Sequence, residues 1–197
     1  MLARTTLLTK AIRAKCIQIQ LNQVASVHIG CNSSHPDANI EKFSTFLPPP
    51  PAPKANYALA LQTGNLLHLS GHLPMTTDAE NGMFTTGVVG NGGDHTTDEA
   101  YDIARCVGGN LIATIKEHCG GDLSKVKQVV KVFGLVNCVD GYEEQPLVVN
   151  GVSDLMIEVF GDERGKGARS AVGVNALPFG VSVEVEAIVE LKERIED

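Results

Sequence analysis

An arginine and two glutamates near the C-terminus of this 197-residue chain combine residue types that can carry out hydrolytic chemistry. Arg169 opens one run of small and β-branched residues, and Glu184 and Glu186 alternate with apolar residues in the next run. A guanidinium binds a carboxylate through a planar pair of hydrogen bonds. A partly desolvated carboxylate can position water or transfer a proton. Together these residues predict a site for a small anionic substrate and a water molecule.

The runs that carry these residues predict two strands joined by a tight connection. Residues 168–174 are mostly small and β-branched, residues 175–180 include turn-forming Asn, Pro and Gly, and residues 181–189 alternate strictly. If the two strands pair, the arginine and a carboxylate share one face of the sheet. In the alternative interpretation, the glutamates are only the solvated face of an antiparallel sheet and Arg169 makes a surface salt bridge. The polar face carries Ser182, Glu184, Glu186 and Ile188.

The rest of the chain predicts the elements that must position this pair. A capping box at Thr96 and Glu99 begins one helix, which ends at Cys119, and Pro146 begins a second helix, which ends at Gly161. The predicted strands are residues 57–62, 66–70, 126–138, 168–174 and 181–189, with a short additional strand at 87–89. The nearly continuous apolar run at 126–138 predicts a strand buried on both faces. This order predicts an α+β fold, a mixed sheet covered on one face by two helices.

Several spaced motifs resemble those of one family. They are Ala168-Arg-Ser-Ala-Val172, Leu177-Pro178, Val183-Glu-Val-Glu-Ala-Ile188, and a strand pair from Gly64 to Pro74 with a Ser-Gly-x-x-Pro ending. Over roughly residues 47–191 the chain resembles the Rid/YjgF family of reactive intermediate (enamine/imine) deaminases, also described as L-PSP endoribonuclease-like. The resemblance implies a chorismate-mutase-like protomer. It also implies a homotrimer with the uncovered sheet faces packed inward and a cleft between each pair of subunits.

The resemblance also implies roles for individual residues. Arg169 matches the arginine that holds the substrate carboxylate, and Glu186 matches the glutamate that positions the attacking water. Glu184 is then an interface or ion-pair residue, although the sequence leaves the reverse assignment open. Substrate-binding positions are matched by Tyr57, Ser70, Gly71 and Asn150.

Two of these assignments have alternatives, and one other position departs from the family pattern. Tyr57 could serve ordinary hairpin packing, and Asn150 could cap a helix. Ala171 stands where many family members have a cysteine, so substrate preference can differ.

No cofactor is implied. His68 and His72 are spaced His-x3-His, but on a strand they need not converge and no third ligand is evident, so no metal is expected.

The implied reaction is hydrolysis of reactive 2-enamine or 2-imino acids to 2-oxo acids and ammonia. The alternative is a trimeric small-carboxylate-binding or chaperone-like protein without turnover, which Ala171 and a Gly/Asn-rich loop at 78–93 motivate. The expected partners are the 2-imino or 2-oxo acid and further copies of the chain. Nucleic acid is not expected, because the chain has no Trp and its body is acidic. A membrane is not expected either, because no apolar run approaches the roughly 20 residues that span a bilayer.

Charge divides the chain into a basic leader and an acidic body. Four basic residues (Arg4, Lys10, Arg13 and Lys15) and no acidic residue precede Asp37, which leaves 12 basic and 23 acidic residues and a formal balance of −11 for the remainder. Residues 1–40 therefore resemble a mitochondrial transit peptide, with a disordered leader on a cytoplasmic protein as the alternative. Residues 41–56 form a Pro-rich spacer, and residues 57–192 form the family domain.

Overall fold

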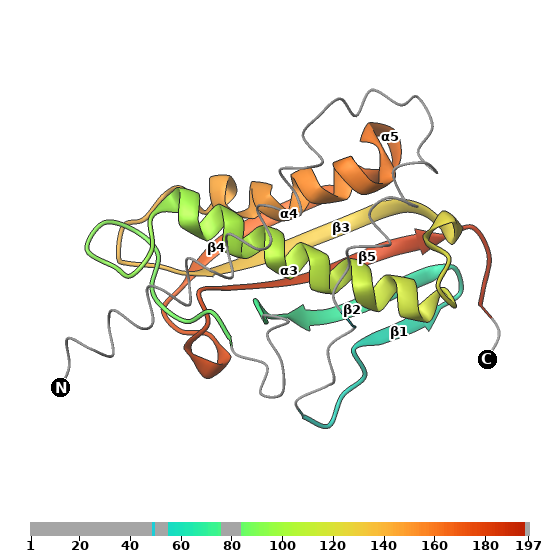
Figure 1. Cartoon of the computed structure of the whole chain (residues 1–197), viewed down its shortest axis with the longest axis horizontal. Helices are drawn as coiled ribbons and strands as arrows, with labels where there is room; N and C mark the ends of the chain where they lie inside the picture. The colour runs from blue at the N-terminus through green and yellow to red at the C-terminus, as the bar shows by residue number, and fades with distance from the viewer. Residues whose placement is uncertain (1–48, 50–54, 76–83, 196–197) are drawn as a thin grey trace.

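The computed structural model of the protein describes residue 49, residues 55–75 and residues 84–195. These residues form one mixed sheet with helices packed on one face, as Figure 1 shows. The predicted leader at 1–40 and nearly all of the spacer at 41–56 lie outside the described residues, as does part of the loop at 78–93. The fold class predicted from the sequence is confirmed.

The sheet has the strand order β1-β2-β5-β3-β4. The strands are β1 (Ala60–Thr63), β2 (Leu66–His72), β3 (Val126–Asn137), β4 (Ala168–Val174) and β5 (Val183–Leu191). All neighbouring pairs are antiparallel except β3 and β4, which are parallel. The first strand begins three residues later than predicted, and Val89 makes only isolated bridges to His95 and Cys138 in place of a short strand.

The helices begin and end where the capping residues predict. Thr96 and Glu99 form the predicted capping box of α3 (Thr97–His118), whose C-cap is Cys119. Pro146 lies in the first turn of α4 (Gln145–Phe160), whose C-cap is Gly161. The structure adds α5 (Asp162–Gly165) and two 3-10 turns, η2 (Leu123–Lys125) and η3 (Pro178–Gly180). None of the helices in the described ranges is long and apolar enough to cross a membrane.

The structure corrects the predicted pairing of the last two strands. β4 and β5 are not neighbours, because β3 lies between them and pairs with both. Arg169 aligns with the buried Val132, whereas Glu186 aligns with Phe133 on the opposite face of the sheet. The prediction that the arginine and a carboxylate share a face is therefore wrong. The physical reason is that α4 returns the chain beside β3 as a parallel crossover, so the turn residues at 175–180 join strands that do not pair.

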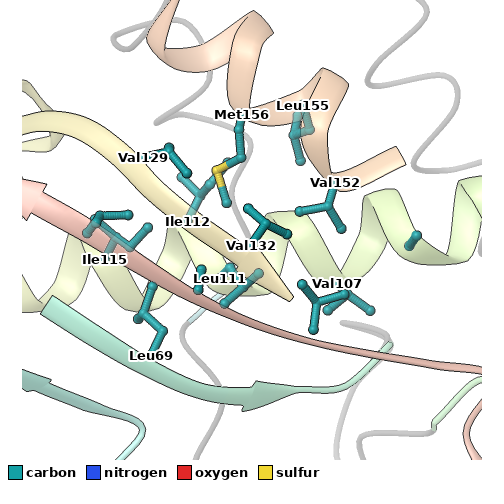
Figure 2. Close-up of a cluster of buried hydrophobic side chains, with 14 of the residues drawn as sticks. Leu69, Val107, Leu111, Ile112, Ile115, Val129, Val132, Val152, Leu155 and Met156 are labelled. Carbon is teal, nitrogen blue, oxygen red and sulfur yellow. The ribbon is translucent and has the colours of Figure 1, made fainter. Parts of the chain in front are cut away.

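The core lies between the helices and the sheet face that they cover. Figure 2 shows side chains of β2, α3, β3 and α4 pointing toward one another, among them Leu69, Leu111, Val132 and Met156. The predicted alternation is confirmed from Val183 to Leu191, where every second residue is buried. The strand begins two residues later than predicted, and Ser182, which was predicted on the polar face, is fully buried. The predicted burial of β3 on both faces is only partial, because Lys131, Phe133 and Leu135 are half-buried on the face without helices. That face is referred to below as the open face.

Candidate functional site

Arg169 is held by neutral hydrogen-bond acceptors from α4. Its Nη1 donates to Asn150 Oδ1 at 2.7 Å and to Ser153 Oγ at 3.1 Å, and its Nη2 donates to the Pro146 carbonyl at 3.2 Å. Among the described residues, no carboxylate lies within ion-pairing distance of this guanidinium. The cation is therefore oriented without being neutralised, which is the arrangement that an anionic ligand requires.

Close packing of the helices positions the two side-chain acceptors. A Cβ added at Gly151 would lie 2.1 Å from the Tyr101 carbonyl oxygen of α3, so only glycine allows α4 to approach α3 this closely. Asn150 precedes this contact, and Ser153 follows one turn after Asn150 on the same side of the helix. Asn150 thus binds the Arg169 guanidinium, and helix capping does not explain it, since Glu144 is the N-cap of α4.

The carboxylate of Glu184 packs against Gly71 on the open face. A Cβ added at Gly71 would lie 1.9 Å from Glu184 Oε1, so the carboxylate occupies the space that a side chain at Gly71 would fill. Burial raises the pKa of Glu184, and the negative charge of nearby Glu186 raises it further. Glu186 is exposed. Glu184 is thus the more buried of the two carboxylates, and its environment favours the protonated form.

A β-bulge places Ser70 and Gly71 beside this carboxylate. Leu69 pairs with Ala187 and His72 pairs with Val185, so β2 uses one more residue than β5 over this interval. The backbone just before β1 holds Ser70 from the other side. The Ser70 N–H donates to the Leu59 carbonyl at 2.9 Å, and the Ser70 hydroxyl donates to the Ala58 carbonyl at 2.7 Å. The bulge therefore presents a rigid backbone wall to the open face.

A hollow of about 450 Å³ opens on the same face next to the bulge. It brings together the predicted residues Ser70 and Glu186, and adds Lys131, whose Nζ donates to Ser170 Oγ at 2.8 Å. The apolar part of its lining comes from Ala58, Leu61, Leu69, Phe133, Ala187 and Ile188. Tyr57 does not line this hollow; it precedes β1 and is 44% exposed.

The predicted site residues thus fall into two groups on opposite faces of the sheet. Arg169 and Asn150 lie together beside α4, and Ser70, Gly71 and Glu186 lie together on the open face. Ser153 was missed by the sequence analysis, although its spacing of three residues from Asn150 on a helix could have revealed it.

The two histidines of the His-x3-His pattern do not converge. His68 is exposed and lines the hollow, whereas His72 is buried and bonds to Ser70 and Thr114.

Comparisons with known proteins agree with the fold and with the motifs. The family described as "YjgF/chorismate_mutase-like, putative endoribonuclease" matches residues 43–191. Protein TCP17 of Trypanosoma cruzi is 41% identical over 154 residues, which cover 78% of this chain and 92% of TCP17. Protein HMF1 of Saccharomyces cerevisiae is 30% identical over 138 residues, which cover 70% of this chain and 86% of HMF1.

A solved structure of similar fold comes from Agrobacterium tumefaciens. The crystal structure of Atu1372, described as a protein of unknown function, is 39% identical with a TM-score of 0.67, over 80% of this chain and 94% of that chain. The resemblance inferred from the spaced motifs is confirmed by the family match and by these relatives. The chain belongs to the YjgF/Rid family, and its sheet with helices on one face is the chorismate-mutase-like fold of that family.

Proposed function

We propose that the protein hydrolyses 2-imino acids, the tautomers of 2-enamine acids, to 2-oxo acids and ammonia. The observation that carries the proposal is the Arg169 guanidinium, which three neutral acceptors orient and no described carboxylate neutralises. A substrate carboxylate supplies the missing charge and the planar geometry that a guanidinium binds best. Membership of the YjgF/Rid family supports a general family function, to which this proposal adds a specific reaction.

The reaction needs a water molecule and a proton, and no oxidant or reductant. The imine nitrogen takes up a proton as water adds to C2, and the added water loses a proton to give the carbinolamine. The amine nitrogen then takes up a second proton and leaves as ammonia, while the hydroxyl group loses its proton to give the 2-oxo acid. A carboxyl group whose pKa is raised can give a proton to nitrogen and take one back from oxygen in each of these two steps. Burial raises the pKa of Glu184, so we assign this role to Glu184 and retain Glu186 as the alternative that the sequence analysis favoured.

The assignment requires two protomers for one site. The backbone of β3 and the sheet itself separate Arg169 from both glutamates within one protomer. β4 is an edge strand, so Arg169 lies at a border that a neighbouring chain can approach. The open face carries half-buried apolar residues with no helix over them, which favours association. We therefore propose a homotrimer with its site in the cleft between subunits.

The direct test is ammonia and 2-oxobutanoate release from 2-iminobutanoate generated in situ. We expect turnover by the wild type, and we expect Glu184→Gln to lower kcat more than Glu186→Gln does. The matched pair separates the two carboxylates, since the variants make the same chemical change two residues apart on one strand. A larger loss of kcat in Glu186→Gln than in Glu184→Gln would assign the proton-transfer role to Glu186.

A second candidate function is carboxylate binding without turnover, because Ala171 stands where many family members have a cysteine. A protein that binds 2-oxo acids through Arg169 but releases no ammonia would be the carboxylate-binding protein without turnover. The family description also names an endoribonuclease, and cleavage of RNA at a rate unaffected by Arg169→Ala would favour that activity. The formal charge of −7 argues against it, because RNA binding gains most of its affinity from basic residues.

A further inference from the structure

We propose that His72 is a positioning residue that holds the Ser70–Gly71 bulge against Glu184 and thereby sets the environment of this carboxylate. The inference rests on the proposed function for its catalytic consequence. The geometry on which it depends is independent of that function. His72 lies on the core side of β2, directly after the bulge, and it is only 2% exposed.

The ring of His72 bonds to the bulge with one nitrogen and to a helix with the other. Nδ1 lies 2.7 Å from the Ser70 carbonyl oxygen, and Nε2 lies 2.8 Å from Thr114 Oγ1 of α3. A carbonyl oxygen can only accept, so Nδ1 carries the hydrogen in this contact. In the neutral ring Nε2 is an acceptor, so the Thr114 hydroxyl shares its one proton between Nε2 at 2.8 Å and the Asn110 carbonyl at 3.2 Å. Burial lowers the pKa of His72, which favours this neutral form.

The contact belongs to a polar seam on the buried side of α3, formed by Asn110 and Thr114. Asn110 Nδ2 donates to the Leu73 carbonyl at 2.9 Å and to the Met75 carbonyl at 3.3 Å. Asn110 and Thr114 are one turn apart and are 2% and 3% exposed. Polar groups buried to this degree cost stability unless each is satisfied. The Asn110 bonds fix the path of residues 73–75 relative to α3, and Thr114 satisfies Nε2 of His72.

This fixed path matters because hydrogen bonds hold the bulge in place from both sides. The Ser70 carbonyl is held by His72, while the Ser70 N–H and hydroxyl are held by the Leu59 and Ala58 carbonyls. Gly71 follows at once and contacts the Glu184 carboxylate. Loss of the His72 bond removes the constraint that holds Ser70 from the core side. The backbone can then move away from Glu184 and admit water.

Two substitutions of His72 separate its two bonds. In His72→Asn, the amide nitrogen is near the place of Nδ1 and can donate to the Ser70 carbonyl, but the side chain does not reach Thr114. In His72→Gln, the longer amide reaches toward Thr114 and leaves the Ser70 carbonyl without its donor. Thr114→Val is a control that removes the helix-side bond and leaves Nδ1 in place. All three substitutions disturb the same buried region, so each is expected to lower the melting temperature.

The decisive measurement is the titration of the Glu184 side-chain carboxyl carbon by 13C NMR in the full-length protein. The other charged or titratable side chains on or beside this face include Glu186, Glu190 with its ion-pair partner Lys127, His68 and Lys131, and they are unchanged in every variant. We expect His72→Gln to lower the Glu184 pKa toward its ordinary value. His72→Asn and Thr114→Val should leave the titration as in the wild type.

Imine hydrolysis supplies the second readout. We expect His72→Gln to lower kcat about tenfold or more with little change in KM, and His72→Asn to retain kcat within about threefold. If His72→Asn and His72→Gln had equal effects on both the Glu184 titration and kcat, the proposal would be overturned and His72 would be a purely structural residue. A wild type without turnover would remove the proposed function, and the Glu184 titration would still decide the role of His72.

Discussion

Replacement of Gly71 by alanine is the sharpest test of the assignment of Glu184. Gly71 is not among the glycines with a left-handed φ, so alanine can adopt its backbone conformation. The added Cβ would nevertheless lie 1.9 Å from Glu184 Oε1, 2.9 Å from Glu184 Cδ and 3.1 Å from Glu184 Cγ. All three atoms belong to one flexible side chain. The methyl group therefore displaces the carboxylate and leaves the sheet in place.

The size of the displacement follows from these distances. Ordinary contact begins at 3.4 Å, so Glu184 Oε1 must move by about 1.5 Å. A misplacement of about 1 Å in a catalytic group can cost roughly 100-fold in rate. Stability should change little, because a compatible Gly→Ala substitution gains about 0.4–1 kcal/mol through the unfolded chain, which offsets the cost of moving one side chain. We expect kcat for imine hydrolysis to fall about 100-fold at a nearly unchanged melting temperature.

The assay is a double-mutant cycle with Glu184→Gln. Ammonia release is measured for the wild type, Gly71→Ala, Glu184→Gln and the double variant, together with the melting temperature of each. If the methyl group acts through Glu184, it should cost little in the Glu184→Gln background. Wild-type turnover by Gly71→Ala would refute the reasoning. An undiminished loss in the double variant would show that Gly71 acts by another route.

Further predictions concern the cation, the buried histidine and the assembly. Arg169→Ala should lower kcat/KM at least tenfold to a hundredfold, because a charge-assisted pair contributes on the order of 1.5–3 kcal/mol, and Arg169→Lys should recover little in the same ammonia assay. The pKa of His72 is lowered from 6.5 by burial, so the unfolded chain takes up a proton that the folded one excludes. The free energy of unfolding from denaturant titrations should therefore fall as pH drops below 6.5, by at most about 1.4 kcal/mol per pH unit for this group, and His72→Asn should flatten that slope. Sedimentation at micromolar concentration should give a trimer, and a monomer would contradict the site shared between protomers. A reporter fused to residues 1–40 should enter mitochondria, and retention in the cytosol would contradict the transit peptide.

The parts of this fold that sequence patterns predicted are those that depend on local interactions. The capping box at Thr96 and Glu99 places a helix start by hydrogen bonds within four residues. The strict alternation from Val183 assigned each β5 side chain to a face, because successive side chains of a strand point in opposite directions. Such signals need no knowledge of which elements become neighbours.

The position of Arg169 depends on neighbours, and for that reason the sequence could not predict it. Turn residues at 175–180 are compatible with a hairpin, but they also suit a connection that passes over another strand. The choice is made by α4, whose crossover sets β4 parallel to β3, and by β3, which takes the place between β4 and β5. Nothing within residues 168–189 encodes this strand order.

The same limit explains why the assignment of the two glutamates stayed open. Both alternate onto one face, so the sequence separates them only by position along the strand. Their difference comes from β2: an extra residue between Leu69 and His72 brings Gly71 over Glu184, whereas Glu186 is left exposed. A bulge has no strong sequence pattern, but a glycine whose missing side chain is replaced by a carboxylate from another strand indicates a built site. Glu184 is therefore the carboxylate whose chemistry the surrounding backbone can control.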